Sequence, residues 1–253
     1  MSDQISYSNS KRIGIVAHSY EGGSLCFLTA CQTGASLFGA HMHPNIVMSA
    51  IPMGLSMPGW EEDNHDEVAK YLLEGINQVA DAGADFFICP DNTAHIVLEK
   101  VIDKSPIPGL HIAQVVGHQI KLEGWKNVGL LGTKWTMTGS VYANALKSNN
   151  LNLVVPNKET RGQINAAIFD ELCQGIFGDE TVELFHKTIN NLRERGAECV
   201  ILGCTEIPLI VSENSSSLPV LDSTRLLARQ AVKIAASNTR IQGPWVELTN
   251  VGL

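Results

Sequence analysis

The chain is 253 residues long, carries a formal net charge of −8, and contains 44% hydrophobic and 17% charged residues. This composition is typical of a globular protein with one large or two small domains, and it excludes a disordered chain. The acidic balance and the lack of a Lys/Arg-rich stripe exclude a nucleic-acid partner, because phosphates need clustered cations.

Targeting and metal-binding signals are missing from the sequence. Residues 1–11 are polar and no run of apolar residues is long enough to span a bilayer, so we expect a cytoplasmic protein with no membrane partner. The six cysteines show no CxxC pair, and the eight histidines show no HExxH-like spacing. We therefore expect neither a disulfide framework nor a metal site.

Apolar runs of strand length alternate with amphipathic segments of helix length. The runs are 13–18, 86–90, 128–133 and 200–204, and the segments include 64–81, 139–149 and 181–195. This alternation predicts an α/β fold with parallel strands that are buried on both faces. Ligands of such folds gather at the carboxyl ends of the strands.

The sequence contains an internal repeat. KRIGIV (11–16) matches KNVGLL (126–131), GAD (83–85) matches GAE (196–198), and IPGLH (107–111) resembles LPVLD (218–222). The three blocks recur in the same order at nearly the same spacing, which predicts two related α/β domains. We place the first at residues 1–113 plus 223–253 and the second at 114–222, with a helix over 223–237 that crosses back to the first.

Equivalent strand ends of the two repeats both carry a reactive residue. When Gly83 is laid on Gly196, Asp91 falls on Cys204. If the two domains face each other about a pseudo-two-fold axis, each contributes one ionisable side chain to a shared cleft. A planar intermediate held there is accessible from both faces.

Two motifs resemble the paired signatures of the aspartate/glutamate racemase superfamily, CNTAH and GCTE. They are CPDNTAH (89–95) and GCTEIP (203–208), and the similarity extends over 129–142, 168–175 and 219–222. The resemblance implies two pseudo-symmetric flavodoxin-like domains, each with a central mostly parallel sheet, and an active site in the cleft between them. It also implies a small amino-acid or related carboxylate substrate, no cofactor, and a possible homodimer.

The first signature departs from the family at its reactive position, because Asp91 stands where the first cysteine is usual. Cys89 lies deeper in the apolar run and is expected in the core. With ordinary pKa values of about 3.9 and 8.5, exchanging Asp⁻/CysH for AspH/Cys⁻ costs about 6 kcal/mol. The resemblance implies two-base chemistry, and with these acidities we predict that Asp91 is the base on one face and Cys204 the acid on the other. Burial is expected to raise the pKa of Asp91, and a helix start after Cys204 to lower that of the thiol.

Further polar residues near the strand ends are candidates for substrate binding, with helix capping as their alternative role. They are Ser19, Asn92, Thr93, Thr133 and Thr205. His95 and Glu206 each lie within one turn of a reactive position and are expected to support it. The first loop, 17–23, lacks the GGMGP-like turn of relatives and places His18 and Ser19 at the strand end.

The leading hypothesis is a cofactor-independent (PLP-independent) amino-acid racemase. No basic residue stands out as a partner for a distal carboxylate, and the apolar segment 51–60 suits a neutral or larger amino acid if it lines the pocket. One alternative is a lyase or isomerase of the same fold, similar to arylmalonate decarboxylase or maleate isomerase. The other is a non-catalytic protein that binds a small metabolite.

Overall fold

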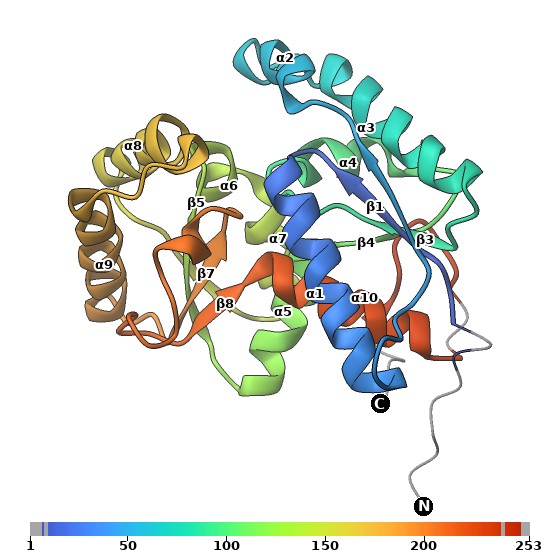
Figure 1. Cartoon of the computed structure of the whole chain (residues 1–253). Coiled ribbons are helices and arrows are strands. Elements are labelled where there is room, and N and C mark those ends of the chain that lie inside the picture. Colours follow the sequence, from blue (N-terminus) through green and yellow to red (C-terminus); the bar gives the residue numbers. More distant parts are fainter. Residues whose placement is uncertain (1–6, 8–9, 239–240, 249–253) are drawn as a thin grey trace, which may run out of the picture. The chain divides into compact units, whose positions relative to one another are not determined.

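The computed structural model describes residue 7, residues 10–238 and residues 241–248 (Figure 1). Within this part of the chain two compact units form, one from residues up to 115 together with those from 224 on, the other from residues 116–223. Each unit holds a four-stranded parallel sheet. The predicted α/β class with two parallel sheets is confirmed.

In the first unit the sheet has the strand order β2-β1-β3-β4. Its strands are β1 (Ile13–Ala17), β2 (Ile46–Ala50), β3 (Phe86–Ile88) and β4 (Gly109–Leu110). Its helices are α1 (Tyr20–Phe38), α2 (Met57–Glu61), α3 (His65–Asp81), α4 (His95–Val101) and α5 (Ile112–Glu123), the last of which continues into the second unit. Single 3-10 turns lie at η2 (Met53–Leu55) and η3 (Ile102–Lys104).

In the second unit the order is β6-β5-β7-β8. Its strands are β5 (Asn127–Gly132), β6 (Asn152–Val154), β7 (Cys199–Gly203) and β8 (Val220–Asp222). Its helices are α6 (Lys134–Thr138), α7 (Ser140–Ser148), α8 (Lys158–Ala166) and α9 (Asp179–Glu194). A π-helical segment, η4 (Ala167–Glu171), follows α8, and 3-10 turns lie at η5 (Leu172–Gln174) and η6 (Ile207–Leu209). Helix α10 (Ser223–Ala236) follows β8 and belongs to the first unit from Thr224 on.

The repeated sequence blocks make the same contacts in both units. Asp85 Oδ2 accepts the backbone N–H of Arg12 (2.6 Å), and Glu198 Oε2 accepts that of Asn127 (2.7 Å). Gly83 and Gly196, two residues earlier, both have positive φ, +84° and +90°, which favours glycine. In each repeat, therefore, the chain turns at a glycine, and the acidic residue two positions later hydrogen-bonds the backbone at the start of the neighbouring strand.

The two faces of the first sheet are covered by different helices because side chains alternate along a strand. Ile13, Ile15 and Ala17 of β1 belong to a buried cluster with residues of α1 and α10, which lie side by side in Figure 1. Gly14 and Val16 face the opposite side, where a Cβ on Gly14 would meet Val79 of α3. His18 follows with the same parity and therefore points to the α3 side.

Some elements were not expected from the sequence. The edge strands β2 and β6 are largely half-buried or exposed, so they do not read as apolar runs. The region taken as the first loop, 17–23, is mostly helical, since α1 begins at Tyr20. Gly23 is a packing residue in that helix, because a Cβ there would lie 2.6 Å from the Cβ of Ala17.

Gly14→Ala tests the close packing of α3 on β1. The new Cβ would lie 2.7 Å from Val79 Cγ2 and 3.0 Å from Ala84 Cβ, both inside the core. We expect a loss of about 1–3 kcal/mol in the free energy of unfolding, measured with urea. Gly162→Ala is the control: its Cβ would meet nothing within 4 Å on an exposed helix, so it should be neutral or stabilising by up to about 1 kcal/mol. Equal effects of the two substitutions would contradict this packing.

Candidate active site

Strand register places His18 beside Asp91. β1 and β3 pair in parallel from Ile13 with Phe86 to Ile15 with Ile88, a constant offset that, continued to the strand ends, reaches His18 and Asp91. Neighbouring parallel strands lie about 4.8 Å apart, so these side chains leave the sheet edge together. His18 Nδ1 lies 2.6 Å from Asp91 Oδ2, with side-chain exposures of 5% and 17%.

A chain of hydrogen bonds continues from this pair to the backbone. His18 Nε2 lies 2.8 Å from Ser56 Oγ, and Ser56 Oγ lies 2.9 Å from the carbonyl oxygen of Met53. The Ser56 hydroxyl has a single hydrogen. When that hydrogen is directed at the Met53 carbonyl, His18 Nε2–H donates to Ser56 and one more proton is shared between His18 Nδ1 and Asp91 Oδ2; when it is directed at His18, Nε2 accepts it and Nδ1–H donates to the Asp91 carboxylate.

The surroundings of Asp91 favour its charged form. Burial raises the pKa of Asp91, but the charge and hydrogen bond of His18 and the backbone N–H of Ala94 outweigh it and leave this pKa below its ordinary value. The Ala94 N–H lies 3.1 Å from Asp91 Oδ1. Asp91 is therefore a carboxylate whose two oxygens are held by separate donors. Burial acts on this pKa in the expected direction, but the net pKa is lowered because His18 and the Ala94 N–H oppose the effect of burial.

His95 supports Asp91 through the backbone. Its Nδ1 donates to the carbonyl of Asp91 (2.8 Å), and its Nε2 accepts the backbone N–H of Ile112 (3.2 Å). The ring is fully buried, and burial together with neighbouring His111 lowers its pKa to about 3. His95 is thus a neutral structural link between the end of β3 and the start of α5.

The second unit holds a different pair at the equivalent strand end. Cys204 follows β7, and its thiol donates to Glu206 Oε2 (2.8 Å). The hydroxyl of Thr205 donates to Glu206 Oε1 (2.7 Å), so one carboxylate holds both side chains. Glu206 is 4% exposed and Thr205 9%. The hydroxyl hydrogen of Thr205 is directed at Glu206, which leaves its lone pairs for any other contact.

The thiol of Cys204 is held protonated. Burial raises its pKa well above the ordinary value, and the charge and hydrogen bond of Glu206 add to this shift. The sequence led us to expect the opposite, a pKa lowered by a helix start. The segment that follows is only the three-residue turn η6, which has a weak dipole, and Glu206 opposes it. To act as a base Cys204 must first lose its proton to a neighbour.

Two of the candidate binding residues cap helices. Ser19 Oγ accepts the backbone N–H of Gly22 at the start of α1, and Thr133 Oγ1 accepts that of Thr136 at the start of α6, each at 3.2 Å. Thr133 follows β5, and the pairing of Gly132 with Gly203 places it next to Cys204 in register. Asn92 is buried and Thr93 half-buried in the turn between Asp91 and α4.

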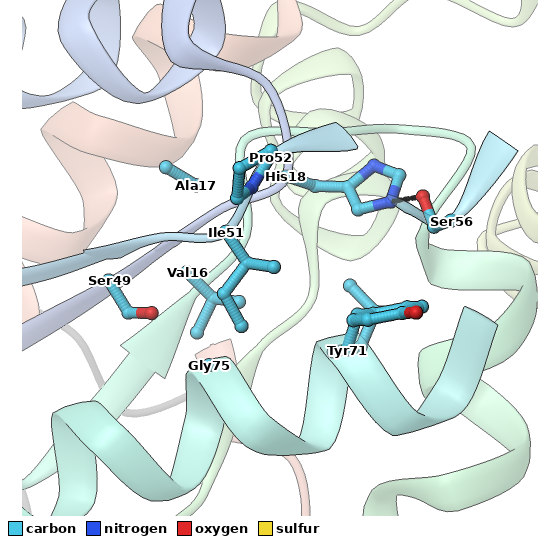
Figure 2. A pocket seen from close by; sticks show the side chains of 10 residues that line it. Val16, Ala17, His18, Ser49, Ile51, Pro52, Ser56, Tyr71 and Gly75 are labelled. Atoms are coloured by element: carbon cyan, nitrogen blue, oxygen red, sulfur yellow. Dashed lines mark hydrogen bonds between the residues drawn. The ribbon is translucent and has the colours of Figure 1, made fainter. Parts of the chain in front are cut away.

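A small cavity opens behind His18 in the first unit, as Figure 2 shows. Its lining includes Val16, Ser49, Ile51 and Tyr71, and its volume of about 10 Å³ has room for roughly one water molecule. Of the apolar segment 51–60, Leu55 is 50% exposed, whereas Trp60 is 4% exposed and packs against the rings of His18 and His65. Trp60 therefore covers the core and not an open pocket.

Sequence reasoning missed the roles of His18 and Ser56. His18 was visible as a polar residue ending the strand IGIVA, and its even spacing from Gly14 and Val16 fixes its side of the sheet. Ser56 gave no signal, because its position depends on the turn η2 in an apolar segment. Among the described residues no cluster of three or more His, Cys, Asp or Glu side chains suits a metal ion. None of the helices in the described part is both long and apolar enough to cross a bilayer.

Comparisons with known proteins agree with this architecture. A family model described as Asp/Glu/hydantoin racemase matches residues 23–231. The broad specificity amino-acid racemase RacX of Bacillus subtilis is 27% identical over 169 residues, which cover 67% of this chain and 73% of RacX.

Two solved structures are similar over most of the chain. A candidate Asp/Glu racemase from Yersinia pestis superposes with a TM-score of 0.83 at 27% identity, covering 90% of this chain and 100% of the other. An aspartate racemase homologue from Pyrococcus horikoshii gives a TM-score of 0.76 at 29% identity, with coverage of 90% and 100%.

Glu206→Gln tests whether Glu206 raises the pKa of the Cys204 thiol. The substitution removes the negative charge that raises the thiol pKa, so that pKa should fall and the thiolate fraction should rise, about tenfold for each unit. The measurement is the rate of iodoacetamide alkylation of Cys204 at pH 8, followed by peptide mass spectrometry. The exposed Glu213→Gln is the matched control and should leave the rate unchanged. An unchanged or slower rate in Glu206→Gln would show that Glu206 does not raise the pKa of the Cys204 thiol.

His95→Gln tests the buried neutral imidazole. The pKa of His95 is about 3 in the folded protein, so the unfolded chain, with a value of about 6.5, binds more protons between the two. The free energy of unfolding therefore decreases as the pH is lowered below about 6.5, by about 2 kcal/mol between pH 7 and pH 5. Urea unfolding at both pH values should show this extra dependence in the wild type and in the control His43→Gln, and its loss in His95→Gln. A dependence retained in His95→Gln would show that another group causes it.

Proposed function

Because this chain belongs to the Asp/Glu/hydantoin racemase family, we propose that it is a cofactor-independent amino-acid racemase with Asp91 and Cys204 on opposite faces of the substrate α-carbon. The observation that supports this most is the equivalence of the two strand ends. Each repeat presents, after its third strand, one proton-transfer side chain joined to a second titratable residue. The substrate would lie in a cleft where both reach the α-carbon.

The chemistry needs one group to remove the α-proton and another to return a proton to the opposite face. As the Cα–H bond breaks, an S–H bond forms at Cys204 once its own proton has moved to Glu206 Oε2, 2.8 Å away. The substrate becomes a planar carbanion whose charge is spread over its carboxylate. A proton from the Asp91 side then forms the new Cα–H bond with inverted configuration.

Donors for the substrate carboxylate come from the turns at the strand ends. Asn92 and Thr93 follow Asp91, and Thr205 follows Cys204, so their backbone N–H groups and side chains lie next to the two reacting groups in the chain. Thr133 is the register neighbour of Cys204. Together these residues would hold the carboxylate so that only the α-carbon faces the proton-transfer groups.

We propose a neutral or bulky amino acid as the substrate. The segment nearest the His18 end of the site is apolar, and its exposed Leu55 offers a surface for an apolar side chain and not for a second carboxylate. RacX, which is named for broad specificity, is similar over 67% of this chain. Its similarity supports a preference that is wider than aspartate and glutamate.

The test is a screen of single enantiomers. Each amino acid is incubated with the protein in deuterated water, and inversion is followed by chiral chromatography while loss of the α-proton signal is followed by NMR. We expect inversion of at least one neutral amino acid together with α-deuterium in the product. Asp91→Asn and Cys204→Ser should each lower inversion by roughly 100-fold or more, because each removes one proton-transfer group.

Arylmalonates and maleate run in the same assay separate this proposal from the lyase and isomerase alternatives. Release of carbon dioxide or cis-trans isomerisation, without inversion of any amino acid, would assign the chain to one of those reactions. Binding of an amino acid without inversion or exchange would assign it to the non-catalytic alternative. Full activity in Asp91→Asn would show that the carboxylate is not one of the two bases.

A further inference from the structure

On the basis of the proposed racemase function, we propose that His18 is a positioning residue that stores the proton delivered by Asp91. In the first turnover Cys204 removes the α-proton, and the Asp91 side then donates a proton to the opposite face of the α-carbon. This is the reverse of the order that ordinary acidities predict for an isolated aspartate and an isolated cysteine.

The starting point is that a lone carboxylate has no proton to give. We assign the Ser56 hydroxyl as donor to the carbonyl of Met53, so that His18 donates from Nε2 to Ser56 and a second hydrogen lies between Nδ1 and Asp91 Oδ2. Asp91 also faces His95 and the buried thiol of Cys89. His95 cannot supply the proton, because its Nδ1–H is held by a backbone carbonyl.

The proton inventory then fixes the direction of the first turnover. The Asp91 and His18 pair carries no net charge and one transferable proton, whereas Cys204 and Glu206 carry one negative charge and can accept a proton. Transfer from the α-carbon to the Cys204 side leaves thiol and carboxylic acid, which are neutral. Transfer from the Asp91 side to the carbanion leaves carboxylate and neutral imidazole, with one negative charge.

Each bond change balances in this sequence. The proton on His18 Nδ1 moves to Asp91 Oδ2 across 2.6 Å, and the O–H bond then breaks as the new Cα–H bond forms. The opposite order would protonate Asp91 beside an imidazolium and leave a thiolate beside the Glu206 carboxylate, 2.8 Å apart in the present pair. It would create a positive pair and a doubly negative pair from a neutral and a singly negative one, which costs electrostatic energy in a buried site.

The opposite enantiomer uses the state left by the first turnover. Asp91 is then a carboxylate beside a neutral imidazole and accepts the α-proton, while the Cys204 thiol, backed by protonated Glu206, returns one. The two states differ only in which pair holds the transferable proton. His18 is therefore what allows a carboxylate to take the place of a thiol in a reversible exchange.

His18→Asn separates proton storage from hydrogen bonding. The Asn amide can still donate toward Asp91 from near the position of Nδ1, but it cannot release a proton. His41→Asn is the matched control, because His41 is exposed and its positive φ of 66° is tolerated by asparagine. Both variants are assayed with each enantiomer separately in deuterated water, for inversion and for deuterium in the unconverted substrate.

We expect His18→Asn to lower inversion by roughly 100-fold, because the Asp91 side loses its proton source. The loss in kcat/KM should be the same in both directions, since the two enantiomers have equal free energy and the equilibrium constant of racemisation is therefore fixed. For the one enantiomer deprotonated by Cys204, the ratio of exchange to inversion should rise at least about tenfold. Cys204 still removes the α-proton there and returns solvent deuterium to the same face. For the other enantiomer, and for His41→Asn with either, this ratio should stay at the wild-type value.

Ser56→Ala provides a second variant with the His18 ring retained. It removes the acceptor of Nε2–H, so that proton is left unpaired in a buried place, which disfavours the doubly protonated ring. We expect the ratio of exchange to inversion to rise in Ser56→Ala as well, for the enantiomer that Cys204 deprotonates, but by less than in His18→Asn. A parallel fall of exchange and inversion for both enantiomers in both variants would reduce His18 to a structural role and overturn the inference. Absence of inversion in the wild type would instead reject the racemase function itself.

Discussion

The hydrogen bond between His18 Nδ1 and Asp91 Oδ2, 2.6 Å long, joins the ends of two neighbouring parallel strands. Much of the first half of the site depends on it. It holds the carboxylate charged in a largely buried place, and it directs one Asp91 oxygen at His18 while the other accepts the Ala94 N–H. A carboxylate without this partner would meet the ordinary cost of burial and would have no proton to exchange.

In the second half of the site the reactive group is held protonated, whereas Asp91 in the first half is held charged. A buried thiol is easily kept protonated, and Glu206 makes it more so. In the proposed mechanism the thiol needs a nearby acceptor for its proton when it acts as a base, and the same carboxylate would be that acceptor. Under the proposed mechanism each repeat supplies the partner that its reactive group needs, a proton donor beside Asp91 and a proton acceptor beside Cys204.

Much of this was predictable from the sequence. Continuous apolar runs located β1, β3, β5 and β7, and the three repeated blocks identified equivalent positions, because Gly83 and Gly196 need positive φ and the following acids tie down a strand. The edge strands β2 and β6 escaped notice since exposed strands carry no continuous apolar pattern. The net directions of the pKa shifts differ from those expected for both reactive residues. They depend on His18, distant in sequence, and on the side-chain direction of Glu206, neither of which periodicity reveals.

The central claim is that His18 holds the transferable proton of the Asp91 pair. Nitrogen NMR of the protein with ¹⁵N-labelled histidine, assigned by comparison with His18→Asn, measures the protonation of both ring nitrogens directly. At neutral pH without substrate, we expect protons on both Nδ1 and Nε2 of His18, and loss of the Nδ1 proton in Asp91→Asn. An Nε2 without a proton, accepting a hydrogen bond from Ser56, would contradict the account, because the Asp91 pair would then have no proton to deliver.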